Sequence, residues 1–259
     1  SLMYLDYERG KRSSYAKFET FPIWNLGLMH PVNIAYEAAT ANLNDVNMID
    51  PYHLEAYGKL AVSYNRDVEA FPVLKRMLEK IMGQTPYKSP TDMGVNMVGF
   101  CITDNEAAIE ASKDEIVRRY YNSLVDFRFA KESYSCVEKI QTLMSNLDIS
   151  PEDRKVALAA REKEELTGKE SFAIELADGR MMRGKKSKLF TAPAACILNA
   201  LKKLGNLDDE ILLLSPHIIE PVSNLKTKSL GETEPSLSIN EMLIALAISA
   251  TTNPLTHMA

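Results

Sequence analysis

The segment 85–99 constrains the fold most, because it separates two long helical patterns and cannot itself be a regular helix. It contains two prolines and two glycines. Pro86 and Pro90 each lack a backbone donor and restrict the residue before them. Before the segment, at about 67–82, and after it, at about 106–131, apolar residues recur every three or four positions. We therefore predict two amphipathic helices joined by a polar loop.

The same segment carries the densest set of polar side chains in the sequence. They are Lys88, Ser89, Thr91, Asp92 and Asn96. In one interpretation, Lys88 neutralises a phosphate, Asp92 holds Mg²⁺ or acts as a base, and the hydroxyl and amide groups orient the ligand. In the other, Asp92 and Thr91 only satisfy backbone groups of the loop. The residue types alone favour the second interpretation, because loops are usually connectors.

Two further groups are candidates for a site. His53 follows Asp50 by three residues, which suggests an acid–base group with an orienting carboxylate, although such a histidine more often caps or packs. Arg66 and Asp67 follow Asn65 at a predicted helix start. The outward backbone donors of a helix start and an arginine suit a phosphate or carboxylate ligand. The alternative is ordinary capping beside a surface arginine.

Periodicity and turn signals divide the chain near residue 169. Residues 1–169 are predicted to form a mainly helical domain with an extended N-terminal segment. Residues 170–259 are predicted to form a smaller α+β domain, in which Asp178-Gly179 is the turn of a β-hairpin. The apolar run 211–214 is predicted to be a buried strand. The expected fold class is therefore α+β and predominantly helical, with helices flanking the hairpin.

Composition and charge argue against several functional classes. A net charge of -5 with 46% hydrophobic residues fits a globular protein and argues against a general nucleic-acid binder, which has a basic surplus. No apolar run reaches the roughly 18–20 residues that a membrane span needs. The three cysteines and four histidines are scattered and form no disulfide framework or zinc pattern. We expect a cytoplasmic protein with reduced thiols, no membrane partner and no dedicated transition-metal site.

Several short stretches, spread over nearly the whole chain, carry a further signal. They include Tyr15-Ala-Lys-Phe-Glu-Thr-Phe-Pro-Ile-Trp-Asn, His30-Pro-Val-Asn, Asp45-Val-Asn-Met-Ile-Asp-Pro, His53-Leu-Glu-Ala-Tyr-Gly-Lys and Tyr87-Lys-Ser-Pro-Thr-Asp-Met-Gly-Val-Asn. Together they resemble a large bacterial family, domain-of-unknown-function family 1846, also called uncharacterised protein family 0371. The resemblance implies a longer protein, with an α/β segment and a glycine-rich, phosphate-loop-like stretch upstream and more chain downstream. It implies no settled activity and no catalytic residue.

The polar clustering and the upstream loop implied by the resemblance lead to one main hypothesis. The chain is predicted to be part of an enzyme acting on a phosphorylated or nucleotide-like small molecule, with Mg²⁺ accompanying a nucleotide. The predicted catalytic residues are Asp92 and His53, and the predicted ligand-binding residues are Arg66, Asp67, Lys88, Ser89, Thr91 and Asn96. The alternative is a non-catalytic, homo-oligomeric assembly or ligand-binding module, in which residues 118–121 of the long helix form the interface between copies.

Overall fold

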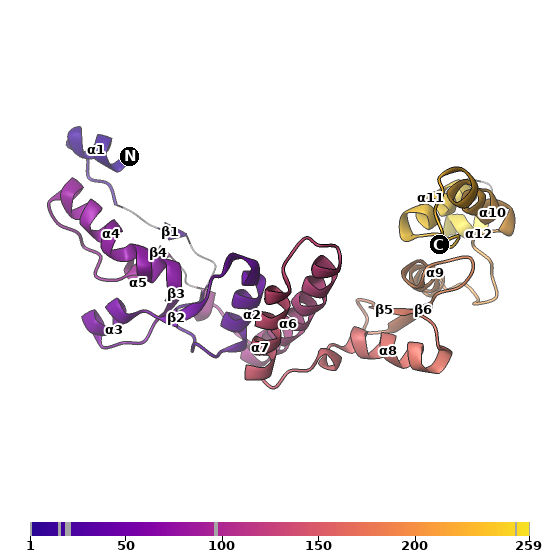
Figure 1. Ribbon diagram of the computed structural model, residues 1–259, viewed down its shortest axis with the longest axis horizontal. Helices are drawn as coiled ribbons and strands as arrows, with labels where there is room; N and C mark the ends of the chain where they lie inside the picture. Colours follow the sequence, from indigo (N-terminus) through magenta and orange to yellow (C-terminus); the bar gives the residue numbers. More distant parts are fainter. Residues whose placement is uncertain (1, 15–16, 19–21, 96–97, 252, 259) are drawn as a thin grey trace. The chain divides into compact units, whose positions relative to one another are not determined.

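The computed structural model describes residues 2–14, 17–18, 22–95, 98–251 and 253–258, and it confirms a predominantly helical α+β fold (Figure 1). Contacts divide the chain between Pro151 and Glu152 into two compact units. The boundary that we predicted near residue 169 lies after helix α8 (Lys155–Thr167), which packs against the strands of the second unit. Periodicity identifies such a helix but does not say which neighbours it packs against.

The first unit is mostly helical. In chain order its described elements are α1 (Leu2–Glu8), β1 (Lys17–Phe18), α2 (Pro31–Ala39), a 3₁₀ turn (Ala41–Leu43), β2 (Asn47–Ile49), α3 (Pro51–Tyr57), β3 (Val62–Tyr64), α4 (Asn65–Met82), α5 (Pro90–Met93), β4 (Gly94–Val95), a 3₁₀ turn (Val98–Phe100), α6 (Asn105–Arg128) and α7 (Tyr134–Asn146). The two long predicted helices are present as α4 and α6. The N-terminal segment, predicted to be extended, begins with the short helix α1.

The first unit has a main core and a smaller cluster. In the main core α6 packs against α2 and α7, as Figure 1 shows. Its buried residues are Ile34, Ala35, Ala38, Ala41, Ile116, Val117, Ile140, Leu143, Met144 and Ile149. In the smaller cluster Phe71 and Leu78 of α4 pack against Met93 of α5. This packing fixes the middle of the segment 85–99 against α4.

A short antiparallel pair of strands positions α3. Strand β2 pairs with β3, with Asn47 opposite Tyr64 and Ile49 opposite Val62, and α3 lies in the connection between them. The pair therefore fixes both ends of the segment that carries His53. Strands β1 and β4 form a second, parallel pair, with Lys17 opposite Gly94.

The second unit combines a β-hairpin with helices. Its elements are α8, β5 (Ser171–Glu175), β6 (Met181–Lys185), α9 (Ala192–Leu204), α10 (Pro216–Asn224), a π-helical turn (Leu225–Ser229), α11 (Ile239–Ala250) and α12 (Pro254–Met258), preceded by a 3₁₀ turn (Pro151–Asp153). The predicted hairpin is confirmed, with β5 antiparallel to β6 and Gly179 at φ 80° in its turn. Helices α8 and α9 both pack on the two strands.

The strand predicted at 211–214 is absent, and this prediction was wrong. Leu213 and Leu214 are buried in the core of the second unit, as an apolar run should be. However, the carbonyl of Leu213 accepts hydrogen bonds from side chains, the hydroxyls of Ser249 at 3.1 Å and Thr256 at 2.7 Å. Hydroxyls that are distant in the sequence thus replace a strand partner.

The structure shows the state of the three cysteines and the apolar content of the described helices. Cys101, Cys136 and Cys196 are all free thiols, the first exposed and the other two buried. Burial raises the pKa of Cys196 to about 11, so this thiol stays protonated. Within the described ranges, none of the helices has both the length and the apolar composition that a membrane crossing requires.

Glu234→Gln is expected to flatten the acid side of the pH–stability curve of the second unit. Hydrogen bonds from Lys186, at 2.6 Å, and from Ser236, at 2.8 Å, lower the pKa of Glu234 to about 2. A carboxyl with a depressed pKa stabilises the fold above its unfolded pKa of about 4.3. That contribution is lost as the pH falls through the folded pKa of about 2.

Thermal unfolding measured between about pH 4.3 and 2 tests this prediction. Glu165→Gln is a matched control, because Glu165 is exposed on α8 and makes no ion pair with any described residue. The control should keep the acid dependence of the unmodified protein. If Glu234→Gln also kept it, the ion pair with Lys186 would contribute nothing to the fold.

Candidate functional site

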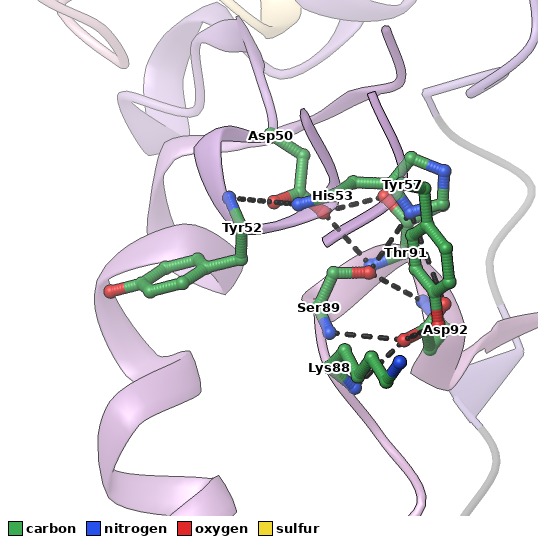
Figure 2. A network of polar contacts seen from close by, with 8 residues as sticks. All are labelled: Asp50, Tyr52, His53, Tyr57, Lys88, Ser89, Thr91 and Asp92. Atoms are coloured by element: carbon green, nitrogen blue, oxygen red, sulfur yellow. Dashed lines mark hydrogen bonds and ion pairs between the residues drawn. The ribbon is translucent and has the colours of Figure 1, made fainter. Parts of the chain in front are cut away.

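The carboxylate of Asp50 connects the start of α3 to the start of α5 (Figure 2). Asp50 is the N-cap of α3 and is 0% exposed. Its Oδ1 accepts hydrogen bonds from the backbone N–H groups of Tyr52 and His53, both at 3.0 Å. Its Oδ2 accepts from the backbone N–H of Thr91 at 3.1 Å and from the Thr91 hydroxyl at 2.6 Å. One buried carboxylate therefore holds together two segments that are distant in the sequence.

Ser89 and Asp92 form a capping box at the start of α5. The backbone N–H of Asp92 donates to Ser89 Oγ at 3.2 Å, and the backbone N–H of Ser89 donates to Asp92 Oδ2 at 3.1 Å. Asp92 Oδ2 also accepts from the backbone N–H of Lys88 at 2.8 Å and from the Tyr57 hydroxyl at 2.9 Å. The Asp92 carboxylate thus binds the backbone N–H groups of the turn that carries Lys88, and it also binds the hydroxyl of Tyr57.

His53 lies between these two carboxylates and is 8% exposed. Its Nδ1 is 3.0 Å from Ser89 Oγ and 3.9 Å from Asp92 Oδ1. Its ring centroid is 4.7 Å from that of Tyr57 and 6.3 Å from that of Trp24. The imidazole is therefore held by one hydrogen bond through Nδ1 and by aromatic rings around it.

Lys88 and Tyr57 form the exposed side of this arrangement. The ammonium of Lys88 lies 5.5 Å from the centroid of the Tyr57 ring, a cation–π distance. Tyr57 is 42% exposed. Burial, the hydrogen bond to Asp92 and the negative charge of Asp92 all raise the pKa of the Tyr57 phenol. The phenol therefore stays protonated and continues to donate to Asp92.

The structure brings together five of the eight predicted site residues. They are His53, Lys88, Ser89, Thr91 and Asp92. Arg66 makes its contacts elsewhere, with Asp45 Oδ1 at 2.5 Å from its Nε and with the carbonyl of Leu43 at 2.8 Å. Asp67 lies in the first turn of α4, and Asn96 lies outside the described residues.

Tyr57 is not among the predicted site residues, and Asp50 is predicted only as an orienting carboxylate for His53, whose backbone N–H it binds in the structure. Asp50 precedes Pro51, and an aspartate followed by proline is a strong signal for a helix start. Tyr57 follows His53 by four residues on the same helix, so the two must share a face. Both signals are local and could have been used, whereas the pairing of Asp50 with Thr91 has no local signal.

The described residues contain no group of three or more His, Cys, Asp or Glu side chains that is placed to hold a metal ion. This finding bears on Asp92, which we considered as a Mg²⁺ ligand. Its Oδ2 already accepts three hydrogen bonds, from the Ser89 and Lys88 backbones and from Tyr57. Among the two interpretations of the loop, the geometry around Asp92 fits the capping one.

Comparison with known sequences identifies two family models and several relatives. Residues 1–148 match the model "Domain of unknown function DUF1846, N-terminal", and residues 152–259 match "Domain of unknown function DUF1846, C-terminal". Similar curated proteins include two named "UPF0371 protein", from Streptococcus pneumoniae strains CGSP14 and Hungary19A-6, and "UPF0371 protein spr0309" from strain ATCC BAA-255 / R6. Each is 58% identical over 254 residues, covering 98% of this chain and 51% of the relative. The chain spans about half the length of the curated relatives it matches.

Proposed function

The chain belongs to the DUF1846 family, and from this premise we propose that it forms part of an enzyme that binds a phosphorylated or nucleotide-like small molecule. The proposed binding surface is the His53–Lys88 cluster, which consists of His53, Tyr57, Lys88, Ser89 and Asp92. The family's description names no activity, so the proposal rests on the chemistry of these side chains.

The acceptors of the His53–Lys88 cluster and of its neighbour Asp50 are largely occupied. The two oxygens of Asp50 take four hydrogen bonds, and Asp92 Oδ2 takes three. Carboxylates whose lone pairs already bind backbone N–H groups have little capacity left for a cation. This argues for an anionic ligand.

The donors of the same cluster are available, and this observation carries the proposal. Among the described residues, the Lys88 ammonium contacts the Tyr57 ring and no carboxylate. Within the same ranges, Nε2 of His53 has no hydrogen-bond partner. A lysine ammonium is a common binder of phosphate, and the partly exposed Tyr57 beside it offers aromatic surface to a planar group such as a base.

The proposal gives the predicted site residues distinct roles. Lys88 and His53 contact the ligand. Asp92 is a positioning residue, because it holds Tyr57 and the Lys88 backbone. Thr91 acts through Asp50 and keeps α5 against α3.

The alternative of a homo-oligomeric module finds less support in the side chains of residues 118–121. Arg118 and Arg119 both pair with Glu115, with Nε–Oε distances of 2.6 and 2.7 Å. Tyr120 and Tyr121 pack against the main core of the first unit. These side chains are therefore engaged within the unit, and an interface between copies at this stripe stays a prediction.

Lys88→Ala is expected to weaken binding of a phosphorylated ligand by about tenfold or more, because a charge-assisted hydrogen bond contributes roughly 1.5–3 kcal/mol. The intact protein is first screened by thermal shift against inorganic phosphate, sugar phosphates and nucleotides, each with and without Mg²⁺. A ligand at a hundredfold its Kd adds about 2.7 kcal/mol of stability. The affinity of a compound that stabilises the protein is then measured by calorimetry.

Lys80→Ala is the matched control, since Lys80 is an exposed lysine in the last turn of α4 and should not change the affinity. Two results would refute the proposal. One is that no phosphorylated compound stabilises the intact protein. The other is that Lys88→Ala and Lys80→Ala bind equally well.

A further inference from the structure

We infer that Ser89 holds His53 in the neutral tautomer with its proton on Nε2, so that the site presents a hydrogen-bond donor, and not a base, to its ligand. The tautomer follows from the contacts of Ser89 alone. The identity of the ligand that receives the hydrogen bond rests on the proposed function.

The hydroxyl of Ser89 has one proton and must place it inside the protein. Ser89 is 0% exposed, so water does not reach it. Its Oγ already accepts from the backbone N–H of Asp92 at 3.2 Å. Among the described residues, His53 Nδ1, at 3.0 Å, is the one acceptor within hydrogen-bond distance of Oγ. Because a buried donor without an acceptor is strongly disfavoured, the hydroxyl donates to Nδ1.

A ring nitrogen that accepts a hydrogen bond cannot itself carry a proton. A neutral imidazole has one N–H, so with Nδ1 as the acceptor the proton is on Nε2. Asp92 does not change this assignment, because its Oδ1 is 3.9 Å from Nδ1, beyond hydrogen-bond distance. A serine hydroxyl, and not the predicted orienting carboxylate, bonds Nδ1 of His53 and fixes the opposite tautomer.

The tautomer decides which chemistry His53 can perform. An Nε2–H group donates to a phosphoryl oxygen and stabilises negative charge there, as oriented donors do in other sites. It cannot accept a proton at Nε2, so His53 is not a general base through that atom. Like the Lys88 ammonium, this N–H is a donor, and donors select oxygen anions over cations.

The tautomer is measured by NMR on the intact protein labelled with ¹⁵N-histidine, at a pH where the imidazole is neutral and without ligand. We expect His53 as a single Nε2–H tautomer. Ser89→Thr keeps the hydroxyl and should keep this tautomer. Ser89→Ala removes the donor and should give a mixture of both tautomers.

His30 is an internal reference in the same spectra. Its Nδ1 accepts from the backbone N–H of Val32 at 3.3 Å, and its Nε2 is 3.1 Å from Asn105 Oδ1, so it should also be an Nε2–H tautomer. Because these partners do not involve Ser89, His30 should be unchanged in both variants. A shift at His30 in Ser89→Ala would mark a general structural change, and the tautomer of His53 in the unmodified protein then decides the assignment.

An Nδ1–H tautomer in the unmodified protein, or an unchanged His53 in a folded Ser89→Ala variant, would overturn the inference. Titration with inorganic phosphate then tests the link to function. Ser89→Ala should bind phosphate about threefold to tenfold more weakly, the effect of one oriented neutral hydrogen bond. If phosphate and its esters do not bind the intact protein, the proposed function fails while the tautomer assignment stands.

Discussion

Replacing Asp50 with alanine is expected to lower the free energy of unfolding of the first unit by about 3–4 kcal/mol, because the change leaves buried donors without acceptors. Two backbone N–H groups of α3 lose their cap, and the N–H and hydroxyl of Thr91 lose the same carboxylate. Asp50 is fully buried, so water does not replace it without opening the contact between α3 and α5.

Asp104→Ala is the matched control for this experiment. Asp104 is also an N-cap aspartate, but it is exposed and caps α6 through one bond, from the backbone N–H of Ala107 at 3.0 Å. Its loss should cost about 1 kcal/mol, as for an ordinary cap. Urea unfolding of both variants gives the comparison. Equal losses in the two variants would mean that the Asp50 contacts across the chain add nothing to a simple helix cap.

Gly184→Ala is expected to destabilise the second unit by about 3 kcal/mol, because the added methyl group overlaps backbone atoms that cannot rotate away. A Cβ at this position would lie 2.2 Å from the backbone N of Cys196 and 2.6 Å from the carbonyl oxygen of Ala192. Both atoms belong to α9, so strand β6 and this helix would have to separate. The glycine is therefore required by the close approach of the two elements.

Gly27→Ala tests the same change where there is space. A Cβ on Gly27 would meet no atom within 4 Å, and its backbone does not need the left-handed region. We expect a change of no more than about 0.5 kcal/mol. Thermal unfolding of both variants decides the point. A Gly184→Ala variant as stable as Gly27→Ala would contradict the packing of α9 on β6.

Local sequence patterns predicted which helices and strands form better than they predicted which residues these elements contact. The helices α4 and α6 and the hairpin β5–β6 follow from periodicity and from an Asp-Gly turn, which are properties of neighbouring residues. The run 211–214 was mistaken for a strand because a short apolar run looks the same whether its backbone pairs with a strand or with side chains. Ser249 and Thr256, which bond Leu213, lie far along the chain.

The same limit applies to the candidate site. Ser89 and Asp92 form a capping box that their spacing in the sequence reveals. The approach of His53 to Ser89 joins residues 36 positions apart, and that of Thr91 to Asp50 joins residues 41 apart. Its position at a predicted helix start placed Arg66 among the predicted ligand-binding residues, but Arg66 pairs with Asp45 instead. Residue types therefore identified most members of the cluster and not the contacts that give them their roles.

The hydrogen bonds that Asp50 accepts within α3 and those that it accepts from Thr91 form at different stages of folding. Its bonds to Tyr52 and His53 span three residues or fewer and can form as soon as α3 exists. Its bonds to Thr91 close a loop of 41 residues, and closing such a loop costs entropy that the local bonds do not. As the chain leaves the ribosome, this carboxylate is therefore half satisfied and open to water until residue 91 has emerged. The cap of α3 thus precedes the contact with α5 along the chain, and His53 acquires its Ser89 partner only after residue 89 has emerged.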